Sequence, residues 1–246
     1  MDSSSSSPTA RSADAAASAA RDTETVRVWD LPTRLFHWTL AGLVIFSVIS
    51  AHIGGDLIVW HFRSGYAVFA LLAFRLLWGL LGGRWSRFSH FVYGPGALLR
   101  YVRGQAREGD RFDVGHSPLG SLSVFALLLF LGLQVGTGLV ADDEIANAGP
   151  LVRFVSEAAS HQLTSYHRDI GQWTLLSLIA LHVLAIVFYR LKHRRDLLGP
   201  MLHGDKQLPS GVPAAVDTLA TRALAMLLMA ACAALVWWVV SLGQQQ

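Results

Sequence analysis

Histidine is the metal-binding residue type that stands out in this sequence, because the chain contains ten histidines and only one cysteine. An imidazole inside a bilayer is costly and usually faces a cavity, a partner or a cofactor. His182 lies in the apolar stretch LLSLIALHVLAIVF, and His167 precedes it by 15 residues. On one helix the two side chains lie within about 60° of the same face and roughly 22 Å apart. This spacing suits two cofactors stacked across a membrane; a hydrogen bond from His182 to a neighbouring helix is the alternative.

Two further histidines stand at matching depths in other apolar runs. His37 opens one run at the depth of His182, and His61 opens another at the depth of His167. Because these two runs start from opposite membrane faces, we expect His37 to meet His182 and His61 to meet His167. The single cysteine excludes a disulfide framework, a cysteine-held iron–sulfur cluster and covalently attached c-type haem. Any metal chemistry must therefore rest on imidazole.

Two of these histidines are followed by a glycine at the same distance. The sequence reads His61-Phe-Arg-Ser-Gly65 and His167-Arg-Asp-Ile-Gly171. A glycine four residues further on lies one helical turn away on the same face, which leaves room for a flat macrocycle against the backbone. Close contact between helices is the alternative use of such a glycine. The occurrence of the pattern at both sites favours the cofactor.

The elements that must position these residues are apolar runs long enough to cross a bilayer. Hydrophobic residues make up 52% of the 246-residue chain and charged residues only 15%, with a mean hydropathy of +0.41. Five runs approach the roughly 20 residues that a transmembrane helix needs. They lie near Leu35–Ile53, Phe62–Gly83, Pro118–Val140, Asp169–Arg190 and Thr218–Leu242. The predicted fold is an all-α integral membrane helical bundle.

The remaining segments are too short and too polar to form a sizeable soluble domain. Residues 1–25 are rich in serine and alanine and contain no apolar stretch for a signal peptide, which predicts a disordered tail. Residues 26–208 hold four of the runs, and residues 209–246 hold a linker and the fifth. In the third run Gly132 and Gly136 predict a packing helix. Cys232 in the fifth run is expected to be a packing residue.

Lysine and arginine in the short loops predict how the bundle is oriented. Basic residues gather between runs two and three and after run four, at Arg84, Arg87, Arg100, Arg103, Arg107, Arg111, Arg190, Lys192, Arg194, Arg195 and Lys206. The other two connections are poor in them. We therefore expect a cytoplasmic N-terminus and a periplasmic C-terminus in a bacterial inner membrane. The positive net charge then reflects membrane topology, and no nucleic-acid partner is expected.

Several short motifs resemble those of the bacterial cytochrome b561 and nickel–iron hydrogenase b-type cytochrome family. They are VWDLPTRLFHW at 28–38, WHFRSGY at 60–66, FRLLWG at 74–79, GHSPLG at 115–120, LHV at 181–183 and PMLHGDK at 200–206. Their order and spacing agree over roughly residues 26–208. The resemblance implies a four-helix core with two non-covalent haems b, each held by two histidines. Carried over position by position, His37 and His182 match the ligands of the inner haem, and His61 and His167 those of the outer haem. The fifth helix lies outside this core.

Arginines near the predicted haems are candidates for contact with haem propionates. Arg75 lies 14 residues after His61, about 40° off its face and about 21 Å deeper, toward the inner haem. A propionate could balance its charge, or the side chain could snorkel to the cytoplasmic surface. Arg34 and Arg63 flank ligands at the two membrane surfaces and are further candidates.

The other histidines have simpler expected roles. His52 follows His37 by 15 residues and rivals His61 as the outer ligand, but it lacks the glycine and the family match. His116 is expected to cap the third helix or to hydrogen-bond locally. We expect the histidines in polar segments to contact solvent or lipid headgroups; these are His90, His161, His193 and His203.

Two haems with two histidine ligands each leave no open iron position, which favours one-electron transfer over oxygen binding. The resemblance also implies the redox partners at the two ends of the electron path. One is a periplasmic cytochrome c or a hydrogenase or dehydrogenase subunit, and the other is a membrane quinone. No flavin or dinucleotide motif accompanies the haem ligands. We therefore expect an electron-transfer subunit of a quinone-linked oxidoreductase.

Two other classes of protein compete with this interpretation. A self-sufficient superoxide–quinone oxidoreductase needs a positive path to an exposed outer haem, and the acidic segment Asp142–Glu144 disfavours it. A transporter that relays protons through membrane histidines predicts broken helices or acidic residues at mid-membrane, and the runs show neither. An absorption spectrum of the purified protein separates these classes.

Overall fold

The computed structural model describes residues 23–107, 109–144 and 147–243, and five of its helical segments are long and apolar enough to cross a membrane. These segments run over Leu31–Ile53, Gly55–Leu81, Pro118–Gly138, Glu157–Lys192 and Leu219–Leu242. They confirm the predicted multi-pass helical bundle. The long helices are named α2 (Leu31–Ile53), α3 (Ile58–Leu81), α5 (Pro118–Gly138), α7 (Gln172–Lys192) and α9 (Leu219–Leu242).

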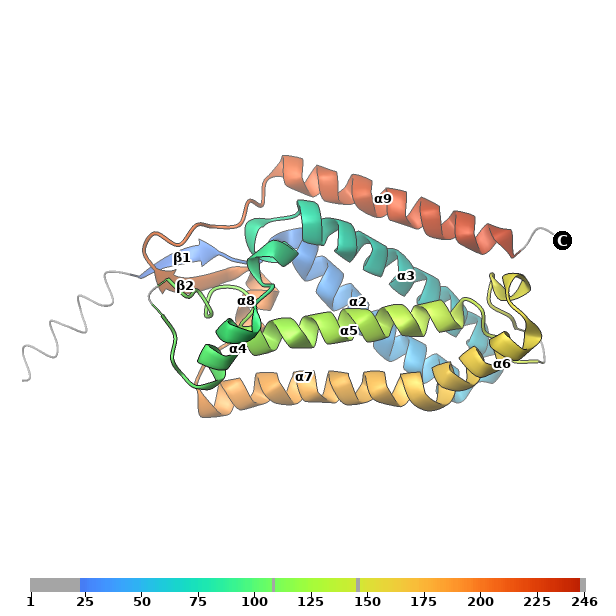
Figure 1. Cartoon of the computed structure of the whole chain (residues 1–246). Coiled ribbons are helices and arrows are strands. Elements are labelled where there is room, and N and C mark those ends of the chain that lie inside the picture. Colours follow the sequence, from blue (N-terminus) through green and yellow to red (C-terminus); the bar gives the residue numbers. More distant parts are fainter. Residues whose placement is uncertain (1–22, 108, 145–146, 244–246) are drawn as a thin grey trace, which may run out of the picture.

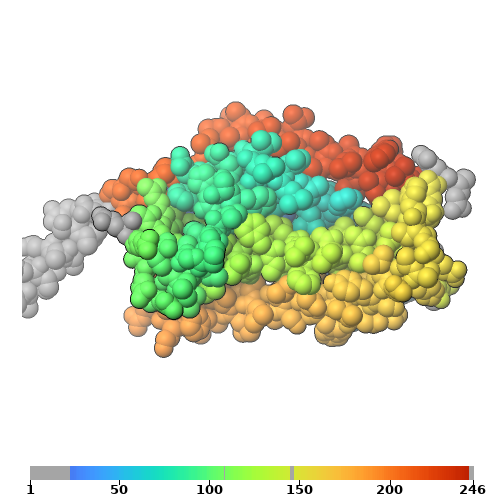
Figure 2. All heavy atoms as spheres, in the orientation of Figure 1, coloured from blue at the N-terminus to red at the C-terminus, as the bar shows by residue number. Residues whose placement is uncertain are grey.

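The helices pack as a layered bundle in which α9 covers one edge. Helix α2 lies against α3, α5 lies beside α7, and α9 runs along α3. In the space-filling view of Figure 2, α9 forms a separate band along that edge. Its buried Cys232 packs against Phe74 and Trp78 of α3, which confirms the expected packing role. Gly132 and Gly136 of α5 instead face away from the other described residues.

Helix α2 begins at Leu31, four residues before the predicted run, because Asp30 caps it. The carboxylate of Asp30 accepts a hydrogen bond from the backbone N–H of Thr33 at 2.8 Å, and Pro32 occupies the first turn. Asp30 is fully buried and also accepts bonds from Trp78, Gly83 and Ser86. One carboxylate therefore joins the start of α2 to the end of α3.

A small two-stranded sheet, absent from the all-α prediction, covers one end of the bundle. Strand β1 (Thr23–Arg27) pairs antiparallel with β2 (Asp205–Pro209), with Arg27 opposite Asp205. The first three residues of β1 belong to the segment that we assigned to a disordered tail; residues 1–22 of that segment lie outside the described residues. The hydrogen bond from Arg222 and the charge of Arg27 hold the pKa of Asp217, beside the sheet, below its ordinary value.

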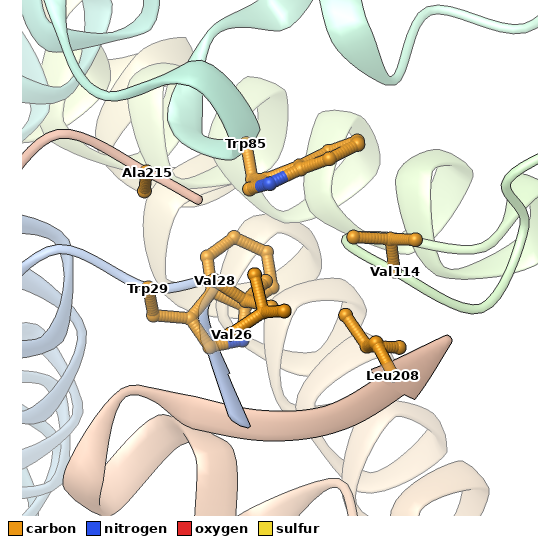
Figure 3. Packing of buried hydrophobic residues seen from close by; sticks show 7 residues of the cluster. All are labelled: Val26, Val28, Trp29, Trp85, Val114, Leu208 and Ala215. Atoms are coloured by element: carbon orange, nitrogen blue, oxygen red, sulfur yellow. The ribbon is translucent and has the colours of Figure 1, made fainter. Parts of the chain in front are cut away.

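The apolar side chains under this sheet form a core of their own, which we call the sheet cap. Trp29 and Trp85 pack there with aliphatic residues of β1, β2 and two loops, as Figure 3 shows. The cluster consists of Val26, Val28, Trp29, Trp85, Val114, Leu208 and Ala215. Short helices α4 (Pro95–Val102) and α8 (Leu198–His203) lie at the same end (Figure 1). Burial of these side chains supplies the stability that a two-stranded sheet alone lacks.

The fourth span is longer than predicted and contains a π-helical turn. It starts with α6 (Glu157–Ser165), which Ser156 caps by accepting the N–H of Ala159 at 3.3 Å. The π-helical turn η5 (Tyr166–Gly171) joins α6 to α7. His167 lies within this turn. Single π-turns in α-helices occur mostly at functional sites, because the extra residue redirects the side chains.

Candidate functional site

The first pair of facing histidines lies at the α6 end of the bundle. The rings of His61 and His167 have centroids 6.0 Å apart at an interplanar angle of 88°. Nδ1 of His61 donates to the carbonyl of Ser47 at 2.9 Å. Nδ1 of His167 lies 3.1 Å from the hydroxyl of Thr137, which donates to its own helix and so accepts from the imidazole. Both rings therefore carry the proton on Nδ1 and keep the lone pair of Nε2 for a ligand.

The second pair lies toward the sheet end. The rings of His37 and His182 have centroids 6.5 Å apart at an angle of 49°. Nδ1 of His182 lies 3.4 Å from the hydroxyl of Ser123 on α5. Nδ1 of His37 is buried without a hydrogen-bond partner in the described part of the chain. The two pairs are those expected from the depths of the histidines.

Both ring separations fit a metal ion held between two imidazoles. A metal–imidazole bond is about 2 Å long and a ring centroid lies about 1 Å behind its nitrogen, so centroids on opposite sides of one ion are roughly 6 Å apart. Among the described residues no group of three or more His, Cys, Asp or Glu could hold a metal. Two imidazoles alone suit an iron whose other ligands come from a macrocycle.

A cavity of about 520 Å³ adjoins the His61–His167 pair. Its walls are mostly apolar, and its volume is in the range of small-molecule and cofactor sites. Gly65 lines it, and a Cβ built on Gly65 meets no atom within 4 Å. Open space therefore lies one turn beyond His61, where we expected room for a macrocycle.

Gly171 has different surroundings from those of Gly65. A Cβ built there would lie 2.2 Å from Oε1 of Gln134 on α5, so the missing side chain allows close contact between helices. Gly171 is the last residue of the π-helical turn and packs against α5, whereas Gly65 faces the cavity. The surroundings of Gly171 match the alternative that we kept open for these glycines.

Arg75 does not snorkel: its side chain stays inside the protein. The residue is 3% exposed, and its guanidinium carbon lies 4.7 Å from the ring centroid of Phe88. Its Nη1 atom is buried with no hydrogen-bond partner in the described residues. Of the other arginines, Arg34 donates to the carbonyl of Leu202 at 2.7 Å, and Arg63 is exposed and stacks on Trp60.

Two histidines that we had set aside lie close to the two pairs. His52 lines the cavity, but its Nδ1 donates to the carbonyl of Val48 at 2.9 Å, its Nε2 lies 3.4 Å from the amide of Gln172, and the ring that faces His167 is that of His61. His116 lies under the sheet cap between Trp29 and Phe91. Burial lowers the pKa of His116 to about 3, and the charge of Arg75 adds to this effect.

Helix α5 supplies polar groups that the sequence analysis missed. We expected only a packing helix, yet Ser123 reaches His182, Thr137 reaches His167, and Gln134 donates to the backbone carbonyl of His167 at 2.8 Å. Groups that orient a ligand's imidazole in this way are typical of metal sites. The sequence does contain a sign of this role. Ser123 and Thr137 are 14 residues apart, so they lie on similar faces of α5 at about the same axial separation as His182 and His167 on their helix.

The fold and the site together define a multi-pass membrane protein whose helices bring two pairs of histidines face to face. The chain belongs to the prokaryotic cytochrome b561 family, whose sequence model matches residues 28–204. It is therefore a membrane-bound b-type cytochrome that functions in electron transfer, and the cofactor of such a cytochrome is haem b.

Curated relatives match most of the chain at low identity. A protein of Bradyrhizobium diazoefficiens named "Probable Ni/Fe-hydrogenase B-type cytochrome subunit" is 25% identical over 227 residues, which cover 79% of this chain and 91% of the relative. A protein of the same name from Rhizobium leguminosarum bv. viciae is 23% identical, with coverages of 79% and 94%. The "Probable Ni/Fe-hydrogenase 1 B-type cytochrome subunit" of Escherichia coli K12 is 22% identical, with coverages of 72% and 88%. No solved structure gives a significant match.

Proposed function

We propose that this chain conducts electrons across the membrane through two haems b, an inner one held by His37 and His182 and an outer one held by His61 and His167. The observation that carries the proposal is the pair of ring separations, 6.5 Å and 6.0 Å, each the distance of two imidazoles on opposite sides of one metal ion. In three of these four imidazole rings, a serine or threonine hydroxyl lies within hydrogen-bond distance of Nδ1, which leaves Nε2 free to bind iron.

The orientation that we propose puts the sheet end in the cytoplasm of a bacterial inner membrane. Both arginine-rich connections, residues 84–111 and 190–206, join helices at that end (Figure 1). Positive residues accumulate in cytoplasmic loops. The outer haem then faces the periplasm, and the C-terminus of α9 lies on that side.

The terminals of the electron path follow from the chemistry of the two haems and from the relatives. When bound, each haem supplies a one-electron ferric–ferrous couple with no free iron position. The chain's own residues fix the imidazoles, and mostly apolar walls surround the outer site. Because the relatives are named as hydrogenase subunits, a hydrogenase subunit is our first candidate for the periplasmic partner, with a dehydrogenase or a cytochrome c as others. The second terminal is the quinone pool, which makes the chain a subunit of a quinone-linked oxidoreductase.

Electron transfer across a sealed bilayer tests this function directly. The purified protein is reconstituted into vesicles with ferricyanide trapped inside, and dithionite, an anion that crosses bilayers slowly, is added outside. We expect the wild type to reduce the trapped ferricyanide much faster than empty vesicles do. Vesicles with the His61→Ala or the His182→Ala variant should lose most of this rate. Equal rates for wild type, variants and empty vesicles would contradict the proposal.

Filling the open space at Gly65 should displace the outer haem without harming the fold. A leucine at this position meets no protein atom near its Cβ and extends into the cavity beside His61. We expect Gly65→Leu to lose most of the outer haem and to keep the inner one, measured as haem per chain. The matched control is Gly132→Leu, whose Cβ also meets nothing but which lies outside the cavity lining. Full haem content in both variants would show that the outer haem does not lie against Gly65.

Neutralising Arg75 should shift the potential of the inner haem alone. A nearby cation favours the ferrous state, which carries one positive charge fewer than the ferric state. Arg75→Gln should therefore lower the inner midpoint potential by roughly 65–130 mV, the equivalent of about 1.5–3 kcal/mol for a hydrogen bond to a charged group. The outer haem should barely respond. A redox titration with optical detection measures both, and equal shifts or none would mean that Arg75 has no contact with a haem.

A further inference from the structure

His116, which the proposed function does not use, has a fixed ring and an unused polar atom. Its centroid lies 4.7 Å from that of Trp29 and 4.4 Å from that of Phe91. The hydroxyl of Tyr93 donates to its backbone carbonyl at 2.9 Å. Nδ1 of His116 is buried and has no hydrogen-bond partner among the described residues. Burying a polar group without a partner is costly, so this atom requires an explanation.

A second buried polar group without a hydrogen-bond partner lies against the same phenyl ring. The guanidinium carbon of Arg75 is 5.9 Å from the centroid of Phe91, and Nη1 of Arg75 also lacks a partner within the described residues. An arginine that is 3% exposed needs an anion nearby. Two polar groups from different parts of the chain, α3 and the loop before α5, thus lie against Phe91 without a hydrogen-bond partner among the described residues.

Among the described residues of α2 and α3 and at Asp30, no carboxylate has a free acceptor position for these groups. Helices α2 and α3 contain no acidic residue over Leu31–Ile53 and Ile58–Leu81. The nearby Asp30 acts on the charge of Arg75, but a carboxylate has only about four lone-pair positions. Four groups already donate to it: the backbone N–H of Thr33 and Gly83, the indole of Trp78 and the hydroxyl of Ser86. A ligand with free acceptor oxygens would satisfy both groups.

Resting on the proposed function, we infer that His116 and Arg75 together bind one carboxylate of the inner haem. A propionate supplies both properties that the two residues require, a negative charge and two acceptor oxygens. The position of His116 agrees, because its ring contacts Trp29 of the sheet cap, at the same end of the bundle as His37 and His182. His116 is then a positioning residue that holds the haem edge under the sheet cap, with the iron held elsewhere.

The test compares substitutions that keep or remove a donor at the position of Nδ1. Asparagine places its amide nitrogen near that position, whereas glutamine reaches the position of Nε2 and leucine donates nothing. Redox titrations of the purified holoprotein measure both haems, and the His182→Ala and His61→Ala backgrounds assign each titration wave to one haem. The control variant is His193→Leu, an exposed histidine after α7.

We expect His116→Leu and His116→Gln to shift the inner haem toward the ferric form by up to about tenfold, which is about 59 mV for one electron. His116→Asn should keep most of the wild-type potential, and His193→Leu all of it. If the leucine variant does not fold, the difference in potential between His116→Asn and His116→Gln still tests the inference. A further arm replaces haem by its dimethyl ester in the wild type; this removes the negative charge of the propionates and should shift the inner wave in the opposite direction, toward the ferrous form.

Three outcomes would overturn this inference. Wild-type potentials in both His116→Leu and His116→Gln, with two haems present, would show that His116 does not bind the haem carboxylate. Unchanged potentials with a loss of haem reduction by a soluble quinol analogue would assign His116 to a quinone instead. A wild type without two haems would overturn the proposed function itself, and the inference with it.

Discussion

The His182→Ala variant should retain only one of its two haems. Without His182 the inner iron loses one of two protein ligands, whereas the outer pair, His61 and His167, is untouched on the other side of the bundle. We expect haem per chain to fall by half, and the remaining haem to keep the optical spectrum and midpoint potential of the outer site. Pyridine haemochromogen assays and redox titration measure these quantities.

A matched control and a reciprocal variant make this result specific. His193→Ala changes an exposed histidine after the same helix and should keep both haems. His167→Ala should lose the outer haem and keep the inner one. If His182→Ala retained both haems at their normal potentials, the assignment of His182 as a ligand would be wrong.

Replacing Asp30 by alanine should cause the largest loss of stability in the chain. The carboxylate is fully buried and accepts bonds from four groups on α2, α3 and the following loop. Its removal leaves these donors unsatisfied and takes the nearest negative charge from Arg75. We expect a loss of about 3–5 kcal/mol, the range found when one member of a buried charged interaction is removed.

Unfolding by SDS in mixed micelles, followed by tryptophan fluorescence and haem absorbance, measures this loss. Asp30→Asn should lose less, because its amide oxygen still accepts bonds. The control Asp56→Ala changes an exposed aspartate in the short connection between α2 and α3 and should stay within about 0.5 kcal/mol of the wild type. Equal stabilities of Asp30→Ala and Asp56→Ala would show that the buried carboxylate is not a structural junction.

The sequence predicts the spans and the histidine pairs because both depend on simple periodicities. A run of about 20 apolar residues has few alternatives to a transmembrane helix. The 15-residue spacing of His167 and His182 relates two positions on one helix, so it also predicts their depths. The places of His37 and His61 at opposite ends of their runs then determine which histidines meet.

The features that the sequence did not predict depend on contacts between distant segments. β1 and β2 are separated by more than 170 residues, and neither has a strong strand pattern of its own. The π-helical turn at His167 changes the winding of one helix locally, which no apolar periodicity records. The contact of Gly171 with Gln134 depends on where α5 packs. Ser123 and Thr137 are short polar residues in an apolar helix, and only the neighbouring imidazoles give them a role.

The number of haems per chain tests the central claim most directly. The claim is that two facing imidazole pairs each hold one non-covalent haem b. Pyridine haemochromogen and amino-acid analysis of the purified protein should give two haems per chain, all of them extractable with acidic acetone, because Cys232 is the single cysteine and lies buried among apolar side chains. One haem or none per chain, or haem that stays attached to the polypeptide after extraction, would contradict the account.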